Sequence, residues 1–98
     1  MKKFTRAMVL KEKNRAGQYW LYDAKKELLY TGISGKIKHR LSSYYQEDDL
    51  SKNAHDEKAP LRPKIKYFLI KYMPKNKAKI SERATVRRAK PRYNQRLK

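Results

Sequence analysis

The net charge is the feature that most limits what this chain can fold into. Twenty-seven lysines and arginines oppose nine acids within 98 residues, which gives a formal net charge of +18. A chain of this length forms one small domain with a thin core, so it cannot enclose many cations without partners. The cations must cover the surface, where they repel one another and attract polyanions. DNA or RNA is the expected partner, because lysine and arginine replace the counterions condensed along the phosphates.

Several other classes of protein fit this composition poorly. The chain has no cysteine, which excludes disulfides and thiolate metal sites. Its two histidines, His39 and His55, do not make a zinc cluster by themselves. No stretch is apolar enough to span a membrane, and the N-terminal residues lack the apolar run of a secretory signal. We therefore expect an intracellular protein, cytoplasmic or nucleoid-associated, that does not bind membranes.

Two β-rich runs separated by a polar connector predict a β-hairpin. The runs cover 18–22 and 28–31, and residues 23–27 have the length of a hairpin loop. A third run, 65–73, is rich in β-branched and aromatic residues and stops at Pro74, which is typical of a central strand.

Helical periodicity appears in two further segments. Ile37, Leu41 and Tyr45 recur at helical spacing and predict a helix over 35–46, with Ser34 as its N-cap. A second helix is predicted over 77–89, because Pro91 disfavours helical geometry at the residue before it. The expected fold is therefore α/β (α+β), a small three-stranded, mainly antiparallel sheet flanked by helices. Residues 1–16 read as a basic N-terminal extension, and 17–98 as the single domain.

One acid in the C-terminal half stands out from its surroundings. Residues 58–98 contain fifteen lysines and arginines but a single acid, Glu82. Helical spacing places Glu82 on the same face as Ala78 and Val86, which is the inward face. An inward carboxylate must be paired, hydrogen-bonded or bound to a metal ion. From spacing alone, a structural salt bridge and a metal ligand both remain open.

The order of these segments resembles the GIY-YIG nuclease family. The two family signatures correspond to Gly17-Gln18-Tyr19 and Tyr30-Thr31-Gly32, on consecutive strands of the predicted hairpin. Residues 30–44 are similar, without a gap, to the nuclease domain of the bacterial excision-repair incision subunit. Residues 82–94 match the glutamate helix of the family and its Lys/Arg-Pro-x-Tyr-Asn ending. The resemblance covers roughly residues 17–96.

The resemblance implies a set of site residues. Its candidate catalytic residues are Tyr19, Tyr30, Arg40, Tyr44, Glu82 and Asn94. Tyr19 would be the general base and Arg40 would contact the scissile phosphate. Nearby cations are expected to lower the pKa of Tyr19 from its usual value near ~10. Glu82 would hold one Mg²⁺ or Mn²⁺ ion, and Asn94 would brace the site.

Cations near these residues are the candidates for binding the nucleic acid. They are Lys36, Lys38, His39, Arg83, Arg87, Arg88 and Arg92. Ile33 replaces a lysine that some family members carry, and Lys36 or Lys38 could supply the missing contact. The middle residues of both signatures, Gln18 and Thr31, also depart from the family pattern. Because they are variable strand positions, little effect is expected from them.

These features predict a metal-dependent endonuclease that nicks one strand of DNA per active site. The alternative is a non-catalytic basic DNA- or RNA-binding module that retains the nuclease fold. DNA is favoured over RNA, and a monomer or weak dimer is expected. A partner protein that targets the enzyme is left open. So are the shape and sequence of the substrate and the biological role, whether in repair, in a mobile element or phage, or in restriction.

Overall fold

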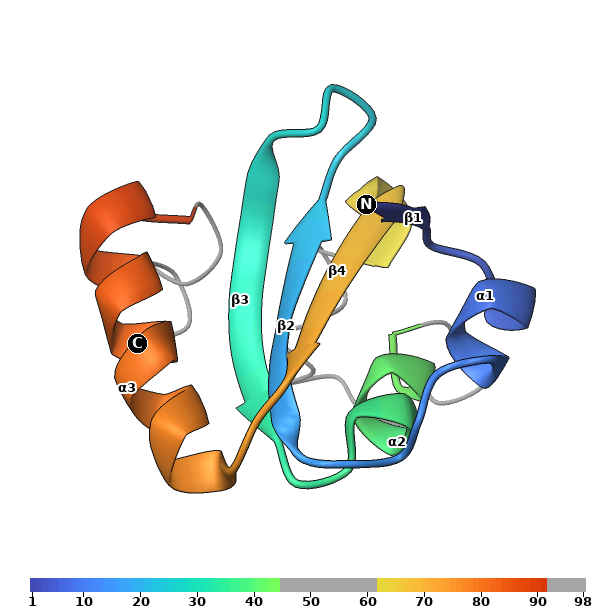
Figure 1. Cartoon of the computed structure of the whole chain (residues 1–98). Helices are drawn as coiled ribbons and strands as arrows, with labels where there is room; N and C mark the ends of the chain where they lie inside the picture. Colours follow the sequence, from blue (N-terminus) through green and yellow to red (C-terminus); the bar gives the residue numbers. More distant parts are fainter. Residues whose placement is uncertain (45–61, 92–98) are drawn as a thin grey trace, which may run out of the picture.

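The computed structural model describes residues 1–44 and 62–91, and its centre is an antiparallel sheet (Figure 1). Four strands lie in the order β1-β4-β2-β3, namely β1 (Lys2–Lys3), β4 (Tyr67–Tyr72), β2 (Gly17–Tyr22) and β3 (Leu28–Ser34). The predicted hairpin is β2–β3, and the predicted third strand is β4. The α+β architecture is confirmed, with one strand more than the sequence predicted.

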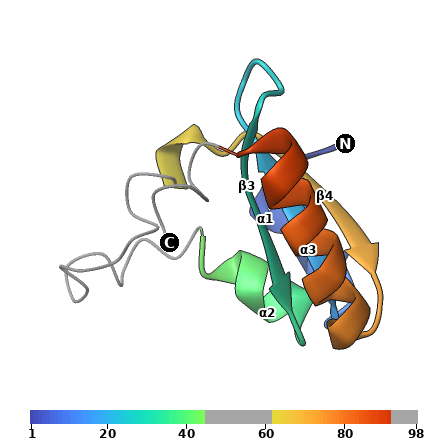
Figure 2. The same cartoon turned by 90° about the vertical axis from the view of Figure 1, so that its left-hand side faces the viewer.

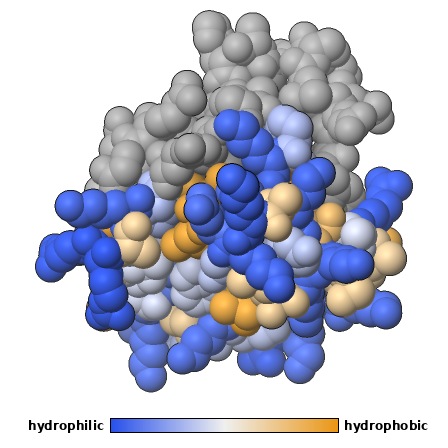
Figure 3. All heavy atoms as spheres, turned by 90° about the horizontal axis from the view of Figure 1, so that it is seen from above, coloured by the Kyte–Doolittle hydropathy of each residue, from blue (hydrophilic) through white to orange (hydrophobic). Residues whose placement is uncertain are grey.

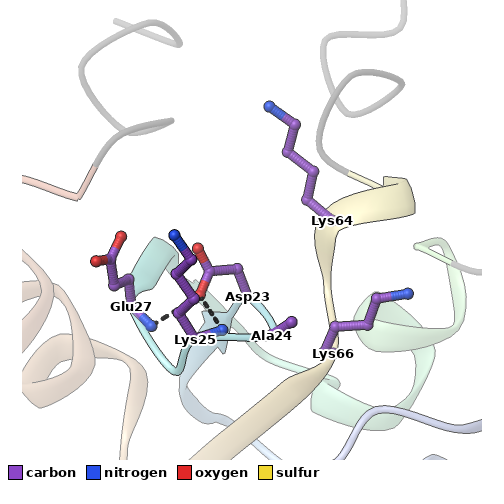
Figure 4. A pocket seen from close by; sticks show the side chains of 6 residues that line it. All are labelled: Asp23, Ala24, Lys25, Glu27, Lys64 and Lys66. Atoms are coloured by element: carbon purple, nitrogen blue, oxygen red, sulfur yellow. Dashed lines mark hydrogen bonds between the residues drawn. The ribbon is translucent and has the colours of Figure 1, made fainter.

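The connector between β2 and β3 forms a turn that its own side chains stabilise. The Asp23 carboxylate accepts hydrogen bonds from the backbone N–H groups of Lys25 and Glu27, both at 2.9 Å (Figure 4). Lys26 has a positive φ of 64°, which the tight turn requires. Lys64 and Lys66 lie across a shallow pocket from this turn (Figure 4). The connector predicted over 23–27 is therefore confirmed.

Helix α2 (Ile37–Ser42) begins two residues later than the sequence predicted. Ser34 is the last residue of β3 and not the N-cap, although its hydroxyl accepts a hydrogen bond of 3.0 Å from the backbone N–H of Lys36. Lys36 is the N-cap and makes no capping bond with its side chain. The predicted helix end at residue 46 lies outside the described residues.

Helix α3 (Lys75–Ala89) follows β4 after a single tight connection. It begins after Pro74, two residues earlier than predicted, and ends at Ala89 as predicted. Lys90 then adopts a left-handed conformation, with φ of 48°, and Pro91 is fully buried. Within the described ranges, no helix combines the length and the apolar character needed to cross a membrane.

The N-terminal residues, expected as an extension, pack onto the domain. β1 pairs with the outer edge of β4, and helix α1 (Arg6–Leu10) places Val9 in the core with no exposed surface. The buried carboxylate of Glu12 accepts a hydrogen bond of 2.7 Å from the hydroxyl of Tyr72 and forms an ion pair with Lys2. A short 3₁₀ turn, η2 (Arg62–Lys64), precedes β4.

The sheet has two faces with different cover. On the tyrosine face, defined by Tyr19 and Leu21, the core packs beneath α1 and α2, and its fully buried members include Val9, Leu21, Ile37, Leu41 and Phe68. On the α3 face, defined by Gln18 and Trp20, α3 lies over β3 and β2. Figure 2 looks onto the free edge of β3, with α3 on one side of this strand and α2 on the other.

Candidate active site

Tyr19 is at the centre of the candidate site. It lies in the middle of β2, and its side chain is only 1% exposed. Its hydroxyl is 2.8 Å from the hydroxyl of Tyr44, which follows α2, and either group can donate this hydrogen bond. The bond joins the sheet to the segment after α2 and fixes the position of the Tyr19 ring.

Gly32 provides the space in which Tyr19 lies. The two residues are paired across β2 and β3. A Cβ atom on Gly32 would be 2.5 Å from the Tyr19 hydroxyl oxygen and 3.0 Å from the ring of Tyr30. The first distance is too short for a Cβ unless Tyr19 moves, and the second is tighter than an ordinary contact, so the second signature needs glycine here for a steric reason.

Two further tyrosines pack against Tyr19. The ring centroid of Tyr30 is 6.2 Å away with an interplanar angle of 42°, and that of Tyr44 is 6.0 Å away at 66°. Tyr44 is 2% exposed, whereas Tyr30 is half-buried. The structure thus brings together three of the candidate tyrosines, two from the signatures and Tyr44 from the segment after α2.

The expected fall in the pKa of Tyr19 is not found in the protein alone. Burial raises this pKa well above its usual value, and the neighbouring phenols of Tyr44 and Tyr30 raise it further. The guanidinium of Arg40 acts in the opposite direction but is outweighed. Tyr19 is therefore a neutral phenol at neutral pH, because a buried phenolate would lack compensating charge.

Arg40 projects from the last part of α2 and is exposed to solvent. Its positive charge lowers the pKa of the Tyr19 phenol, against the larger effect of burial. An exposed guanidinium next to buried hydroxyls can form two parallel hydrogen bonds with a phosphate that approaches from solvent. Arg40 directly precedes Leu41, a fully buried residue of the same helix, but its own side chain is exposed.

Glu82 is half-buried on α3, one turn after buried Ala78 and one turn before buried Val86. Its side of the helix therefore faces the sheet, as predicted. The helix itself, however, packs on the α3 face, and Arg40 belongs to a helix on the tyrosine face. Arg40 and Glu82 therefore do not roof one face of the hairpin, because their helices flank β3 from opposite sides (Figure 2).

The side chains present fit a divalent cation held by few protein ligands. In the described part of the chain, no three histidine, cysteine or acidic side chains lie close enough together to hold a metal ion. Mg²⁺ usually binds proteins through one or two carboxylates and keeps several waters. A single carboxylate such as Glu82 is therefore a suitable donor set for Mg²⁺, and an unsuitable one for zinc.

The candidate nucleic-acid-binding residues occupy two helices. Lys36 is the N-cap of α2, and Lys38 and His39 lie within the helix, where the backbone N–H of His39 donates to the side chain of Asn14 at 3.0 Å. Arg83, Arg87 and Arg88 are exposed on α3. Viewed from above, hydrophilic side chains cover most of the described surface, with small hydrophobic areas between them (Figure 3). Arg92 and Asn94 lie outside the described residues.

A buried polar network is the feature that the sequence reasoning missed. Gln18 is fully buried, and its amide donates hydrogen bonds to the hydroxyls of Thr31 at 2.8 Å and Thr85 at 3.3 Å. Thr31 in turn donates to the backbone carbonyl of Tyr19 at 2.8 Å. The middle residues of the two signatures thus connect the strand of Tyr19 to the helix of Glu82. Polar residues at both middle positions were the available signal.

Comparisons with known proteins agree with this geometry. The sequence profile of the UvrC-like GIY-YIG domain matches residues 15–95. Among curated proteins, none matches the chain. The magnesium-bound GIY-YIG N-terminal endonuclease domain of UvrC from Thermotoga maritima is 20% identical, with a TM-score of 0.75 over 95% of this chain and 98% of that one. A point mutant of the same domain, bound to the catalytic divalent cation, is 19% identical with a TM-score of 0.74 over 95% and 97%.

Proposed function

Because the chain belongs to the family of UvrC-like GIY-YIG domains, which have the fold of a metal-dependent endonuclease, we propose that it hydrolyses phosphodiester bonds in DNA and nicks one strand per active site. The observation that carries this proposal is the packing of Tyr30 and Tyr44 against Tyr19, whose hydroxyl lies in the space that Gly32 leaves open and is influenced by the charge of Arg40.

Arg40 has the role of holding the scissile phosphate. Its guanidinium is exposed, and it can bind two phosphoryl oxygens at once and offset the charge that develops on them. The cations at the start of α2, Lys36 and Lys38, then contact neighbouring phosphates and orient the strand.

Tyr19 has the role of general base: once its own proton has passed to solvent, the phenolate accepts the proton of the attacking water. Its pKa is raised in the protein alone, so this role needs additional positive charge when substrate is bound. Arg40 already acts in that direction. The hydrogen bond with Tyr44 keeps the Tyr19 hydroxyl in one place, which limits the geometries in which it can meet a water.

Glu82 has the role of holding one Mg²⁺ or Mn²⁺ ion with waters in the remaining positions. Bound there, the cation would supply positive charge to the phosphoryl oxygens and to the leaving oxygen. Asn94 is proposed to brace the site, the role that the family resemblance implies. Arg92 is proposed to contact the backbone of the nucleic acid.

The alternative function is a DNA- or RNA-binding module that keeps this fold without cleavage. The charge of +18 supports binding with or without catalysis. The two functions differ in their need for metal, because phosphate binding by lysine and arginine needs no Mg²⁺. A carboxylate that faces bound phosphates without a cation would weaken binding, so Glu82→Gln should strengthen DNA binding in a pure binding module.

Nicking of supercoiled plasmid tests the proposal. Wild-type protein with Mg²⁺ should convert supercoiled to open-circular DNA, and EDTA should abolish the conversion. Glu82→Ala and Tyr19→Phe should each reduce the rate at least a hundredfold while plasmid binding is retained. If the protein binds plasmid, branched DNA and RNA but cleaves none of them, it is instead the non-catalytic binding module. Cleavage that survives Glu82→Ala would show that the site lies elsewhere.

A further inference from the structure

Part of the α3 face of the sheet is left uncovered by α3. The helix is attached near the start of β2, where Thr85 bonds to Gln18, and it extends over β3 (Figures 1 and 2). Leu69 on β4 shares this face and is 42% exposed, and Ile80 on α3 is 71% exposed. Both aliphatic side chains therefore meet solvent on this side of the sheet.

Three aromatic side chains lie on this uncovered face. Trp20 is paired with Leu69, and Tyr22 is paired with Tyr67 across β2 and β4, so all four share one face of the sheet. The three aromatic residues are half-buried, which means that each ring keeps part of its surface accessible. They form, with Leu69, a surface that we call the aromatic platform.

A lysine lies at each end of the aromatic platform. The ammonium of Lys26 lies 5.6 Å from the ring centre of Tyr67. Lys71 is exposed and pairs with Gln18, so it extends the same face toward α3. Lys71 and Lys77 also line a groove of about 570 Å³ between β4 and α3, together with Ile80. The partner of such a surface carries negative charge and flat or apolar groups.

We propose that the aromatic platform binds single-stranded nucleic acid. Unpaired bases stack on aromatic rings, while flanking lysines contact the phosphates between them. A duplex presents few base faces, so it cannot use the rings in this way. The platform lies on the face opposite Tyr19, and it needs neither Glu82 nor a metal ion. This second contact would select substrates that carry an unpaired strand, and it stands independently of cleavage.

Fluorescence of Trp20, the only tryptophan in the chain, reports directly on the platform. Titration of the full chain with a twelve-nucleotide thymidine strand in EDTA should quench this fluorescence to saturation. An abasic strand with the same number of phosphates should bind roughly tenfold more weakly and leave the fluorescence unchanged. Quenching that is absent, or equal for the two strands, would overturn the proposal.

A charge-matched pair of variants separates the platform from the general attraction of a basic protein. Lys71→Glu should weaken binding of the thymidine strand roughly tenfold more than Lys11→Glu, an equal change of charge at an exposed residue that follows α1. Equal weakening by both variants would show that only net charge matters. Quenching by a poly-glutamate peptide as strong as that by the thymidine strand would assign the face to an acidic protein instead.

Discussion

At the scale of single residues, Gly32 decides whether the tyrosine cluster can form. A Cβ atom on Gly32 would lie only 2.5 Å from the hydroxyl oxygen of Tyr19, so the hydroxyl occupies space that a side chain would need. This close approach explains why the second signature ends in glycine in terms of packing alone. The sequence could identify Gly32 from its signature. The reason for a glycine at this position became visible only from the pairing of Gly32 with Tyr19 across β2 and β3.

Gly32→Ala should therefore displace the Tyr19 ring. We expect a loss of about 1–3 kcal/mol in the free energy of unfolding, as for other overpacked sites, together with a large loss of nicking. Gly35→Ala is the matched control, because nothing lies within 4 Å of the Cβ that it would add. Urea denaturation and plasmid nicking of both variants make the comparison. Equal behaviour of the two variants would contradict the role given to Gly32.

Tyr19 shows where residue-level reasoning from sequence fails. The identity of the tyrosine could be predicted from its signature, but the direction of its pKa could not. A count of nearby cations predicted a fall, whereas burial and two neighbouring phenols produce a rise. Burial depends on how α2 closes over the sheet, and that packing is not visible in a count of charges.

At the scale of elements, α3 docks through small and polar side chains. Its buried residues are Ala78 and Val86, and its bond to the sheet runs from Gln18 to Thr85. Small apolar residues permit several helix positions, whereas a buried hydrogen bond permits few. The network therefore fixes the position of the helix that carries Glu82.

Thr85→Val tests this role, because valine has nearly the same shape without the hydroxyl. We expect a loss of about 1 kcal/mol in the free energy of unfolding and a higher Mg²⁺ concentration for half-maximal nicking. Thr85→Ser keeps the hydroxyl and should behave like wild type in both measurements. A normal Mg²⁺ requirement in Thr85→Val would leave the network without a part in catalysis.

The N-terminal elements give a prediction for alkaline pH. Burial and the Glu12 carboxylate raise the pKa of Tyr72 from 10.0 to about 12. A raised pKa favours the protonated phenol in the folded protein, so its stabilisation is complete below pH 10 and is lost as the pH rises to about 12. Chemical denaturation between pH 9 and pH 12 should show a smaller loss of stability in Tyr72→Phe than in wild type. Identical losses would contradict this assignment.

Long patterned segments could be predicted from the sequence, and short ones could not. The hairpin, β4 and α3 have strong periodicity or clear terminal residues, and all three were predicted. The two-residue strand β1 and the five-residue helix α1 carry too little pattern of their own. They are ordered by tertiary contacts, such as Val9 in the core, which local sequence does not reveal.

At the scale of the whole molecule, charge governs the binding of nucleic acid. A net charge of +18 should make the affinity for DNA fall steeply with salt. Arg87→Gln and Arg88→Gln, on the exposed side of α3, should each lower the slope of log affinity against log salt by about one. Fluorescence anisotropy with labelled duplex in EDTA measures these slopes. Unchanged slopes would exclude this helix from the DNA interface.

The arrangement of the candidate site was predictable only in part. The family resemblance named Tyr19, Tyr30 and Tyr44 as site residues, and these three tyrosines pack together on one face. The hydrogen bond from Gln18 to Thr85 holds α3 on the other face. From the sequence, Gln18 was expected to be a variable strand position of little effect. Helical spacing could show that Glu82 faces inward but not which face of the sheet it approaches.

The dependence of the cleavage rate on Mg²⁺ concentration tests the central claim most directly. Single-turnover nicking below saturation should rise with the first power of Mg²⁺ concentration, because Glu82 is proposed to hold one ion. Glu82→Gln should shift the half-maximal concentration upward at least tenfold, with DNA binding in EDTA no weaker than that of wild type. A second-power dependence, or an unchanged half-maximal concentration in Glu82→Gln, would contradict the one-ion site.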